Sequence, residues 1–136
     1  KDVSEKSIKG LHILLAEDNE LNMEISEFVL RNEGADVTKA WNGQEAVERF
    51  RKSRVGEFNV ILMDIMMPVK NGYEAARLIR SLDREDAKTI PIIAMTANAF
   101  TEDRIRAKEA GMDEHIAKPI DVELLIKVIH KLVKHN

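Results

Sequence analysis

Apolar residues along the chain fall into short continuous runs, separated by longer stretches in which apolar positions recur at helical spacing. The runs are rich in β-branched and aliphatic residues and predict five buried strands, at residues 12–16, 35–40, 58–64, 90–96 and 114–117. A helix-patterned stretch follows each strand, which gives five strands alternating with five helices. This order predicts an α/β domain with a mostly parallel sheet covered by helices on both faces.

The first and last helices carry the clearest signals. The first should be capped by Asp18 or Asn19 and should end at Gly34. Its apolar residues on one face are Leu21, Ile25, Phe28 and Val29. Asp121 should cap the last helix, in which apolar residues again repeat at helical spacing.

The fourth helix is poor in large apolar side chains. Between Glu102 and Ala110 only Ile105 is bulky and aliphatic. Because docking strength follows the apolar area that a helix buries, we expect this helix to be the least firmly attached of the five and a candidate moving part.

Composition supports one domain. The chain has 136 residues, is 44% hydrophobic and has a formal net charge of −3; we expect a polar leader at residues 1–10 and a single soluble domain at 11–136. The start at Lys1 indicates a piece of a longer protein. The chain has no cysteine, which excludes disulfides and thiolate-rich zinc sites.

The same features limit the partners. No apolar run approaches the roughly 20 residues that span a bilayer, so we expect no direct membrane contact and a cytoplasmic domain. This expectation is compatible with a parent protein that is anchored in a membrane. The slightly acidic balance, without a Lys/Arg stripe interleaved with aromatics, argues against nucleic acid as a direct ligand.

Polar residues that could carry chemistry lie at or directly after the carboxyl ends of four of the predicted strands. They are Glu17 and Asp18, Asp64, Thr96, and Lys118 before Pro119, with Gly72 marking a turn beyond Asp64. The carboxyl edge of a parallel sheet is where ligands bind in open α/β folds. Each residue alone has an ordinary explanation, such as a helix cap for Asp18 or a solvated surface group for Lys118.

Taken together, these motifs resemble the receiver domain of response regulators in two-component signalling, from about His12 to Val133. The segments that carry the resemblance are Leu15-Ala16-Glu17-Asp18-Asn19, Met63-Asp64-Ile65-Met66-Met67-Pro68, Met95-Thr96-Ala97 and Lys118-Pro119. The match is strongest to receivers of hybrid sensor histidine kinases. It implies a doubly wound, flavodoxin-like sheet with strand order 2-1-3-4-5.

In that order the first and third strands are neighbours, so Glu17, Asp18 and Asp64 should converge. Their mutual repulsion would be relieved by Mg²⁺, which prefers oxygen ligands, and by Lys118. The resemblance implies that Asp64 is the phosphoacceptor, that Asp18, Asp64 and the backbone carbonyl of Met66 bind Mg²⁺ directly, and that Glu17 acts mainly through water. It further implies a cis Lys118–Pro119 bond and a Thr96 hydroxyl that turns toward the phosphoryl group.

Two positions bear on how the domain would switch. His115 stands three residues before Lys118, where the family commonly has tyrosine or phenylalanine, and this departure weakens the usual aromatic switch. Met66 has no group that would orient a hydrolytic water, whereas Asn98 has one. We therefore expect slow to moderate hydrolysis of an aspartyl phosphate.

The resemblance implies that the domain accepts a phosphoryl group from the phosphohistidine domain of a histidine kinase and passes it to a histidine-phosphotransfer domain or changes conformation. It would catalyse its own phosphorylation without being a turnover enzyme in the usual sense. Three alternatives remain: a Mg²⁺-dependent phosphohydrolase, which would need a general acid where Met66 stands; a flavin-binding module, disfavoured by Glu17 and Asp18 where phosphate would bind; and a receiver-like binding module that works without phosphate.

Overall fold

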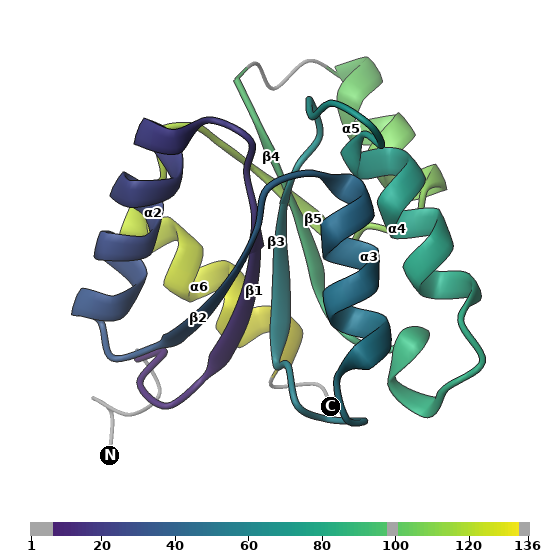
Figure 1. Cartoon of the computed structure of the whole chain (residues 1–136). Helices are drawn as coiled ribbons and strands as arrows, with labels where there is room; N and C mark the ends of the chain where they lie inside the picture. Colours follow the sequence, from purple (N-terminus) through teal and green to yellow (C-terminus); the bar gives the residue numbers. More distant parts are fainter. Residues whose placement is uncertain (1–6, 98–100, 134–136) are drawn as a thin grey trace.

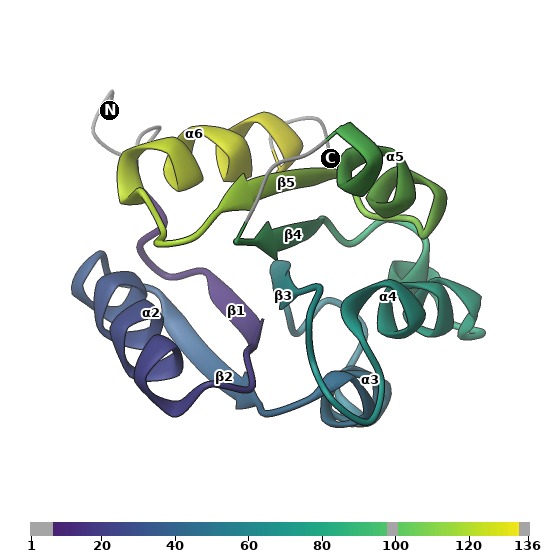
Figure 2. The same cartoon turned by 90° about the horizontal axis from the view of Figure 1, so that it is seen from above.

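The sheet is parallel, five-stranded and ordered β2-β1-β3-β4-β5 (Figures 1 and 2). This arrangement comes from a computed structural model that describes residues 7–97 and 101–133. The strands are β1 (His12–Ala16), β2 (Asp36–Ala40), β3 (Val60–Asp64), β4 (Ile92–Thr96) and β5 (Glu114–Ala117). The helices are α2 (Glu20–Asn32), α3 (Gly43–Lys52), α4 (Gly72–Ser81), α5 (Thr101–Glu109) and α6 (Val122–Val133), with a short 3₁₀ turn η1 (Glu85–Ala87). The predicted fold class and strand order are confirmed.

Helices cover both faces of the sheet, as Figure 2 shows from above: α2 and α6 lie on one face, and α3, α4 and α5 lie on the other. Every residue of β3 and β4 is buried, as expected for strands covered on both sides. Two apolar clusters result, one on each face of the sheet. The carboxyl ends of the strands are thereby fixed in position by packing from both sides.

Three of the strands begin one or two residues later than the sequence predicted. The fourth shows the reason most clearly, because Pro91 has no amide hydrogen for the ladder and β4 begins at Ile92. The carboxyl ends, at Ala16, Asp64, Thr96 and Ala117, are where the sequence placed them.

Asparagine side chains cap the helices that follow β1, β2 and β3. Asn19 accepts a hydrogen bond from the amide of Asn22, and Asn42 and Asn71 make the equivalent bonds at α3 and α4. Since Asn19 is the cap of α2, that helix does not use the neighbouring carboxylate of Asp18.

Helix α2 has an exposed apolar side. Leu21, Ile25 and Phe28 are 64%, 50% and 70% exposed, whereas Met23 and Leu30 face the core. The predicted apolar face therefore exists, but most of it faces solvent. In α5, the single bulky residue Ile105 is also exposed. No helix within residues 7–97 and 101–133 is both long and apolar enough to cross a membrane.

Candidate functional site

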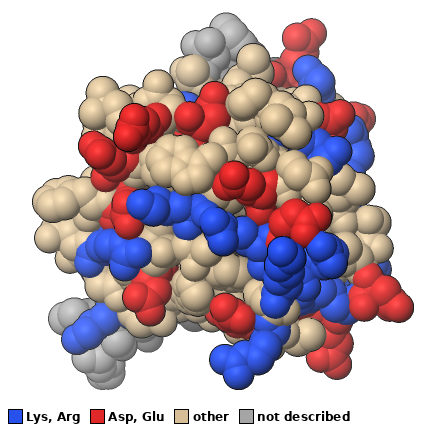
Figure 3. Space-filling view, in the orientation of Figure 1, with Lys and Arg blue, Asp and Glu red and all other residues tan. Residues whose placement is uncertain are grey.

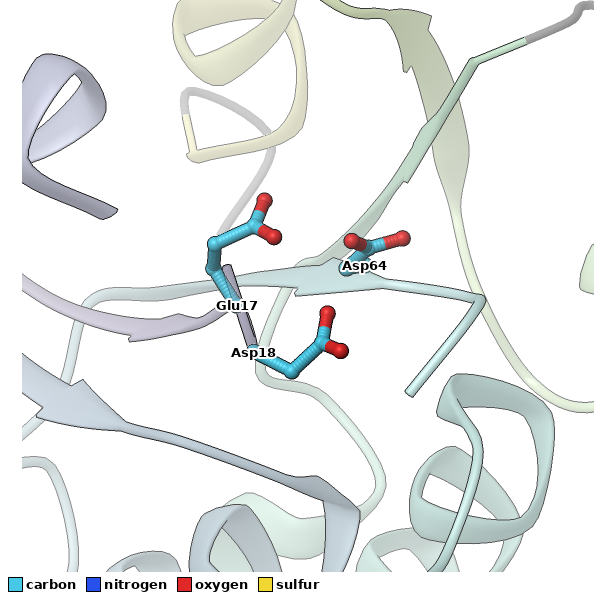
Figure 4. A group of neighbouring side chains, drawn as sticks. All are labelled: Glu17, Asp18 and Asp64. Carbon is cyan, nitrogen blue, oxygen red and sulfur yellow. The ribbon is translucent and has the colours of Figure 1, made fainter. Parts of the chain in front are cut away.

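Three carboxylates converge at the carboxyl edge of the sheet (Figure 4). Glu17 and Asp18 directly follow β1, and Asp64 is the last residue of the neighbouring β3. One oxygen from each carboxylate lies within 4.8 Å of the others. The predicted convergence is confirmed.

Both oxygens of Asp64 have hydrogen-bond donors. Lys118 Nζ donates to Oδ2 over 2.8 Å, and the amide of Met66 donates to Oδ1 over 3.0 Å. The residue as a whole is only 2% exposed. Asp64 is consequently held in one orientation, with its carboxylate directed toward Glu17 and Asp18.

Glu17 is fully buried, although it carries an acidic group. Its Oε2 accepts a hydrogen bond from the amide of Asn19 (3.1 Å), and its Oε1 lies 3.4 Å from Lys118 Nζ. Burial, with a smaller contribution from the charge of Asp64, raises the pKa of Glu17 above its ordinary value. The site therefore holds more negative charge than its single lysine offsets.

Lys118 reaches the carboxylates from the segment after β5. The Lys118–Pro119 peptide bond is cis, as predicted, and the Lys118 amide donates to the carbonyl of Thr96 over 2.8 Å. Burial by itself would lower the pKa of Lys118, but the hydrogen bond and charge of Asp64, with the charge of Glu17, raise it. Lys118 is thus a cation at neutral pH, placed beside Asp64 and Thr96.

The β3–α4 loop borders the site and is fixed by its backbone. Val69 has a positive φ of 67°, and the amide of Lys70 donates to the carbonyl of Pro68 over 2.6 Å, which closes a tight three-residue turn. Gly72 is required after the turn, because a Cβ there would lie 2.5 Å from the carbonyl oxygen of Asp64. Met66, in the first part of this loop, is 74% exposed.

The donor set suits a hard divalent cation. Glu17, Asp18 and Asp64 offer only oxygen atoms, and two of the three carboxylates are buried. Among the described residues, the only basic side chain that forms an ion pair with them is Lys118. Carboxylate oxygens at this density are typical of Mg²⁺ and Ca²⁺ sites rather than of zinc sites.

His115 has a partner that the sequence did not indicate. Arg104 Nε, in α5, donates to His115 Nε2 over 2.9 Å. Burial and the nearby charge of Arg104 lower the pKa of His115. Asn98, which we considered for water positioning, lies outside the described residues.

Two backbone groups at the site were also missed in the sequence. The amides of Asn19 and Met66 each bind a carboxylate oxygen two residues earlier in the chain. The signal was present, since each amide lies two residues after an acidic residue at the carboxyl end of a strand. The long-range contact between Arg104 and His115 has no comparable local signal.

Comparisons with known proteins agree on a family. Residues 13–130 match the model of the response regulator receiver domain. The chain is 44% identical over 122 residues, 89% of its length, to hybrid signal transduction histidine kinase M of Dictyostelium discoideum. The chain spans only 5% of the length of that protein. It spans 7% of hybrid signal transduction histidine kinase I of Dictyostelium discoideum and 13% of histidine kinase 1 of Arabidopsis thaliana.

Solved structures give the same result. The receiver domain of a sensor histidine kinase from Pseudomonas aeruginosa PAO1, with magnesium in its active site cleft, superimposes with a TM-score of 0.81 at 38% identity, over 92% of this chain and 98% of the other. The receiver domain of Saccharomyces cerevisiae Ssk1, solved in complex with the histidine phosphotransfer protein Ypd1, does so with 0.78 at 28% identity, over 93% and 90%. The chain belongs to the response regulator receiver domains of two-component signalling, and its relatives include the receivers of hybrid histidine kinases.

Proposed function

We propose that Asp64 accepts a phosphoryl group from a phosphohistidine. The observation that carries this proposal is the position of the Asp64 carboxylate, which is buried, hydrogen-bonded on both oxygens and adjacent to a lysine and two further acids. A carboxylate in this setting is oriented for in-line attack at phosphorus. The product is an aspartyl phosphate.

The side chains around Asp64 have distinct roles in this reaction. Lys118 Nζ, 2.8 Å from Oδ2, stabilises negative charge on the transferred phosphoryl oxygens. The Met66 amide keeps Oδ1 in place while Oδ2 exchanges its hydrogen bond for the new bond to phosphorus. Thr96, at the end of the neighbouring strand β4, supplies a hydroxyl that turns toward the phosphoryl group after transfer.

We infer that Mg²⁺ is the cofactor. Asp18, Asp64 and the backbone carbonyl of Met66 would hold it directly, with Glu17 acting through water. This is supported by the oxygen-only cluster and by the magnesium in the cleft of the Pseudomonas relative. When bound, the ion neutralises the carboxylates and the incoming phosphoryl group.

The partner surface that we propose is the exposed apolar side of α2, which consists of Leu21, Ile25 and Phe28. This helix begins three residues after Glu17, so a protein seated on it brings its own reactive group close to Asp64. The yeast receiver of similar fold binds a histidine phosphotransfer protein. We propose a kinase's phosphohistidine domain upstream and such a phosphotransfer domain downstream, in the cytoplasm, with residues 1–10 as a leader and no direct contact with nucleic acid or membrane.

Phosphorylation of the isolated domain by a small-molecule phosphodonor tests the acceptor. With Mg²⁺ present, one phosphoryl group should appear by intact-mass spectrometry and should be released by hydroxylamine, which cleaves acyl phosphates. The Asp64→Asn protein should show none, whereas the matched control Asp36→Asn, at an exposed position in β2, should behave like the parent.

Three results would contradict the proposal. Phosphorylation that persists in Asp64→Asn would place the acceptor elsewhere. A complete absence in the parent domain, together with unchanged binding to its partner, would favour the phosphate-independent binding module. Continuous turnover of small phosphate esters would instead favour the phosphohydrolase.

A further inference from the structure

Sulfur atoms are distributed very unevenly between the interior and the surface of this domain. The chain has no cysteine and six methionines, all within the described residues. Five methionines are buried: Met23, Met63, Met67, Met95 and Met112. Met66 is 74% exposed, and its neighbour Met67 is only 9% exposed. The thioether of Met66 is therefore the only sulfur atom that solvent reaches freely.

Met66 is also held beside the acceptor. Its amide donates to Asp64 Oδ1, so its backbone cannot move without disturbing the carboxylate. The loop beyond it is fixed by the tight turn at Val69 and by the close approach of Gly72 to the Asp64 carbonyl. An exposed apolar side chain that the backbone holds next to a polar site is not explained by core packing.

We propose that Met66 is a modification site at which a hydroperoxide oxidises the thioether to the sulfoxide, and that the sulfoxide shortens the lifetime of phosphorylated Asp64. In the first step, a lone pair of the sulfur attacks the terminal peroxide oxygen. The O–O bond breaks and an S–O bond forms, and the proton of the transferred oxygen passes to the other peroxide oxygen. That oxygen leaves as an alcohol, or as water when the oxidant is H₂O₂. The sulfur loses two electrons and the peroxide gains them.

The consequence follows from hydrogen-bonding capacity and rests on the proposed function. A thioether is a very weak acceptor and cannot orient a water molecule, which favours a long-lived aspartyl phosphate. A sulfoxide oxygen is a strong acceptor on the same flexible side chain. It can hold a water near the phosphoryl group attached to Asp64, and positioning of a nucleophile accelerates its attack.

Peptide mapping by mass spectrometry after graded H₂O₂ exposure of the folded domain tests the modification. Met66 should gain one oxygen at least about tenfold faster than the buried methionines, because oxidation follows exposure. Met67 lies in the same peptide and is the internal comparison. Unfolding in guanidinium should abolish the difference. Equal rates for Met66 and Met67 in the folded protein would overturn the proposal.

The lifetime of the acyl phosphate tests the consequence. Domain phosphorylated by a small phosphodonor is followed after removal of the donor, with and without prior oxidation. Oxidation should shorten the half-life by about two- to tenfold, as expected for one added water-positioning group. In Met66→Leu, compared with itself before and after peroxide, the half-life should not change, because no accessible sulfur remains. Treatment with methionine sulfoxide reductases should restore the original half-life of the parent.

These measurements separate this proposal from the proposed function. If the domain takes no phosphoryl group in either state, the proposed function fails, while the mapping still decides whether Met66 is oxidised. If Met66 is oxidised and phosphorylation occurs but the half-life is unchanged, the proposed effect of the sulfoxide is wrong. A change of equal size in Met66→Leu would assign the effect to another residue.

Discussion

At the scale of single residues, the site has more negative than positive charge. Glu17 and Asp64 are almost fully buried, and the one lysine between them cannot offset both together with Asp18. Unpaired buried charge costs free energy, and the raised pKa of Glu17 reflects that cost. Such a site is expected to gain from a bound cation, and each charge in it should influence the others.

Replacing Lys118 by methionine should separate two properties of the site. Loss of the ammonium group, 2.8 Å from Asp64, should slow phosphorylation by about 10²- to 10³-fold, because charge on the phosphoryl oxygens is no longer stabilised. Mg²⁺ should bind more tightly, by about two- to tenfold, because a nearby positive charge is gone. Phosphodonor kinetics and a Mg²⁺ titration followed by tryptophan fluorescence measure the two effects.

Lys127→Met is the matched control, because Lys127 is an exposed lysine of α6. Its phosphorylation rate and its Mg²⁺ affinity should both equal those of the parent. Weaker Mg²⁺ binding in Lys118→Met would mean that the lysine supports the metal site in some way other than through its charge.

At the scale of elements, polar anchors complement the apolar packing. Arg84, just before η1, donates from Nη1 to the carbonyls of Phe50 (2.6 Å) and Ser53 (2.9 Å), which lie at the end of α3. Its guanidinium also binds Asp86, and Asp86 in turn accepts a hydrogen bond from the amide of Gly56. This network connects the α3–β3 loop to η1 at the amino-terminal ends of the strands, opposite the functional site.

The network predicts a pH-dependent contribution to stability. Burial alone would raise the pKa of Asp86, but hydrogen bonds from Arg84 and Gly56 outweigh it and lower the pKa below its ordinary value of 3.8. The ionised form is therefore the stabilising one. Its contribution is complete above about pH 3.8 and is lost as the pH falls through the lower pKa of the folded state.

Asp86→Asn should accordingly reduce the free energy of unfolding at pH 7 by about 1–3 kcal/mol, as expected for hydrogen bonds to a charged group. The difference from the parent should shrink below pH 3.8. Urea denaturation across this pH range measures it, with Asp83→Asn, in the exposed connection after α4, as the control. A difference that stays constant with pH would exclude the charge of Asp86 as its cause.

The edge strand β2 carries a second set of anchors. All five residues of β2 lie in register with β1, and the amide of Asp36 and the carbonyl of Ala40 hydrogen-bond toward β1. Because backbone groups alternate in direction along a strand, the carbonyls of Val37 and Lys39 point away from β1. Arg31 of α2 donates to the carbonyl of Val37 (2.9 Å), and Arg49 of α3 donates to that of Lys39 (2.7 Å). The two arginines come from α2 and α3, helices on opposite faces of the sheet (Figure 2). On the face of the molecule drawn in Figure 3, Lys and Arg side chains form a band across the middle.

Blocked edges of this kind prevent strand-to-strand association. The double variant Arg31→Ala/Arg49→Ala should expose both carbonyls and form dimers or larger species at concentrations where the parent is monomeric. Analytical ultracentrifugation measures this. A control that removes Arg51 and Arg54, two exposed arginines of the α3 end and the loop after it, should sediment like the parent, because Arg51 pairs with Glu48 rather than with β2. An unchanged distribution for the double variant would show that these arginines do not protect the edge.

At the scale of the whole molecule, the sequence predicted the sheet and its functional edge well. Periodicity distinguishes strands from helices, and acids, a threonine or a lysine at the carboxyl ends of four strands identify the functional edge of the sheet. The sequence predicted less well which side of α2 faces the core. Leu21, Ile25 and Phe28 form an apolar side as strong as that of Met23 and Leu30, and only packing against the sheet decides between them. Contacts such as Arg104 with His115 depend on tertiary structure and have no local pattern.

The repulsion at the site links its chemistry to the stability of the fold. Without metal, Asp18→Asn should raise the free energy of unfolding by about 0.5–1 kcal/mol, because one of three converging carboxylates is removed. Mg²⁺ should stabilise the parent by about 2.7 kcal/mol at a hundred times its dissociation constant, since it binds the folded state alone. In Asp18→Asn at the same concentration, the gain should be much smaller because a ligand is lost. Thermal and urea unfolding with and without Mg²⁺ measure all four states. If Mg²⁺ stabilised both proteins equally, the ion would be bound outside this cluster, and the link between the acidic site and the fold would have to be abandoned.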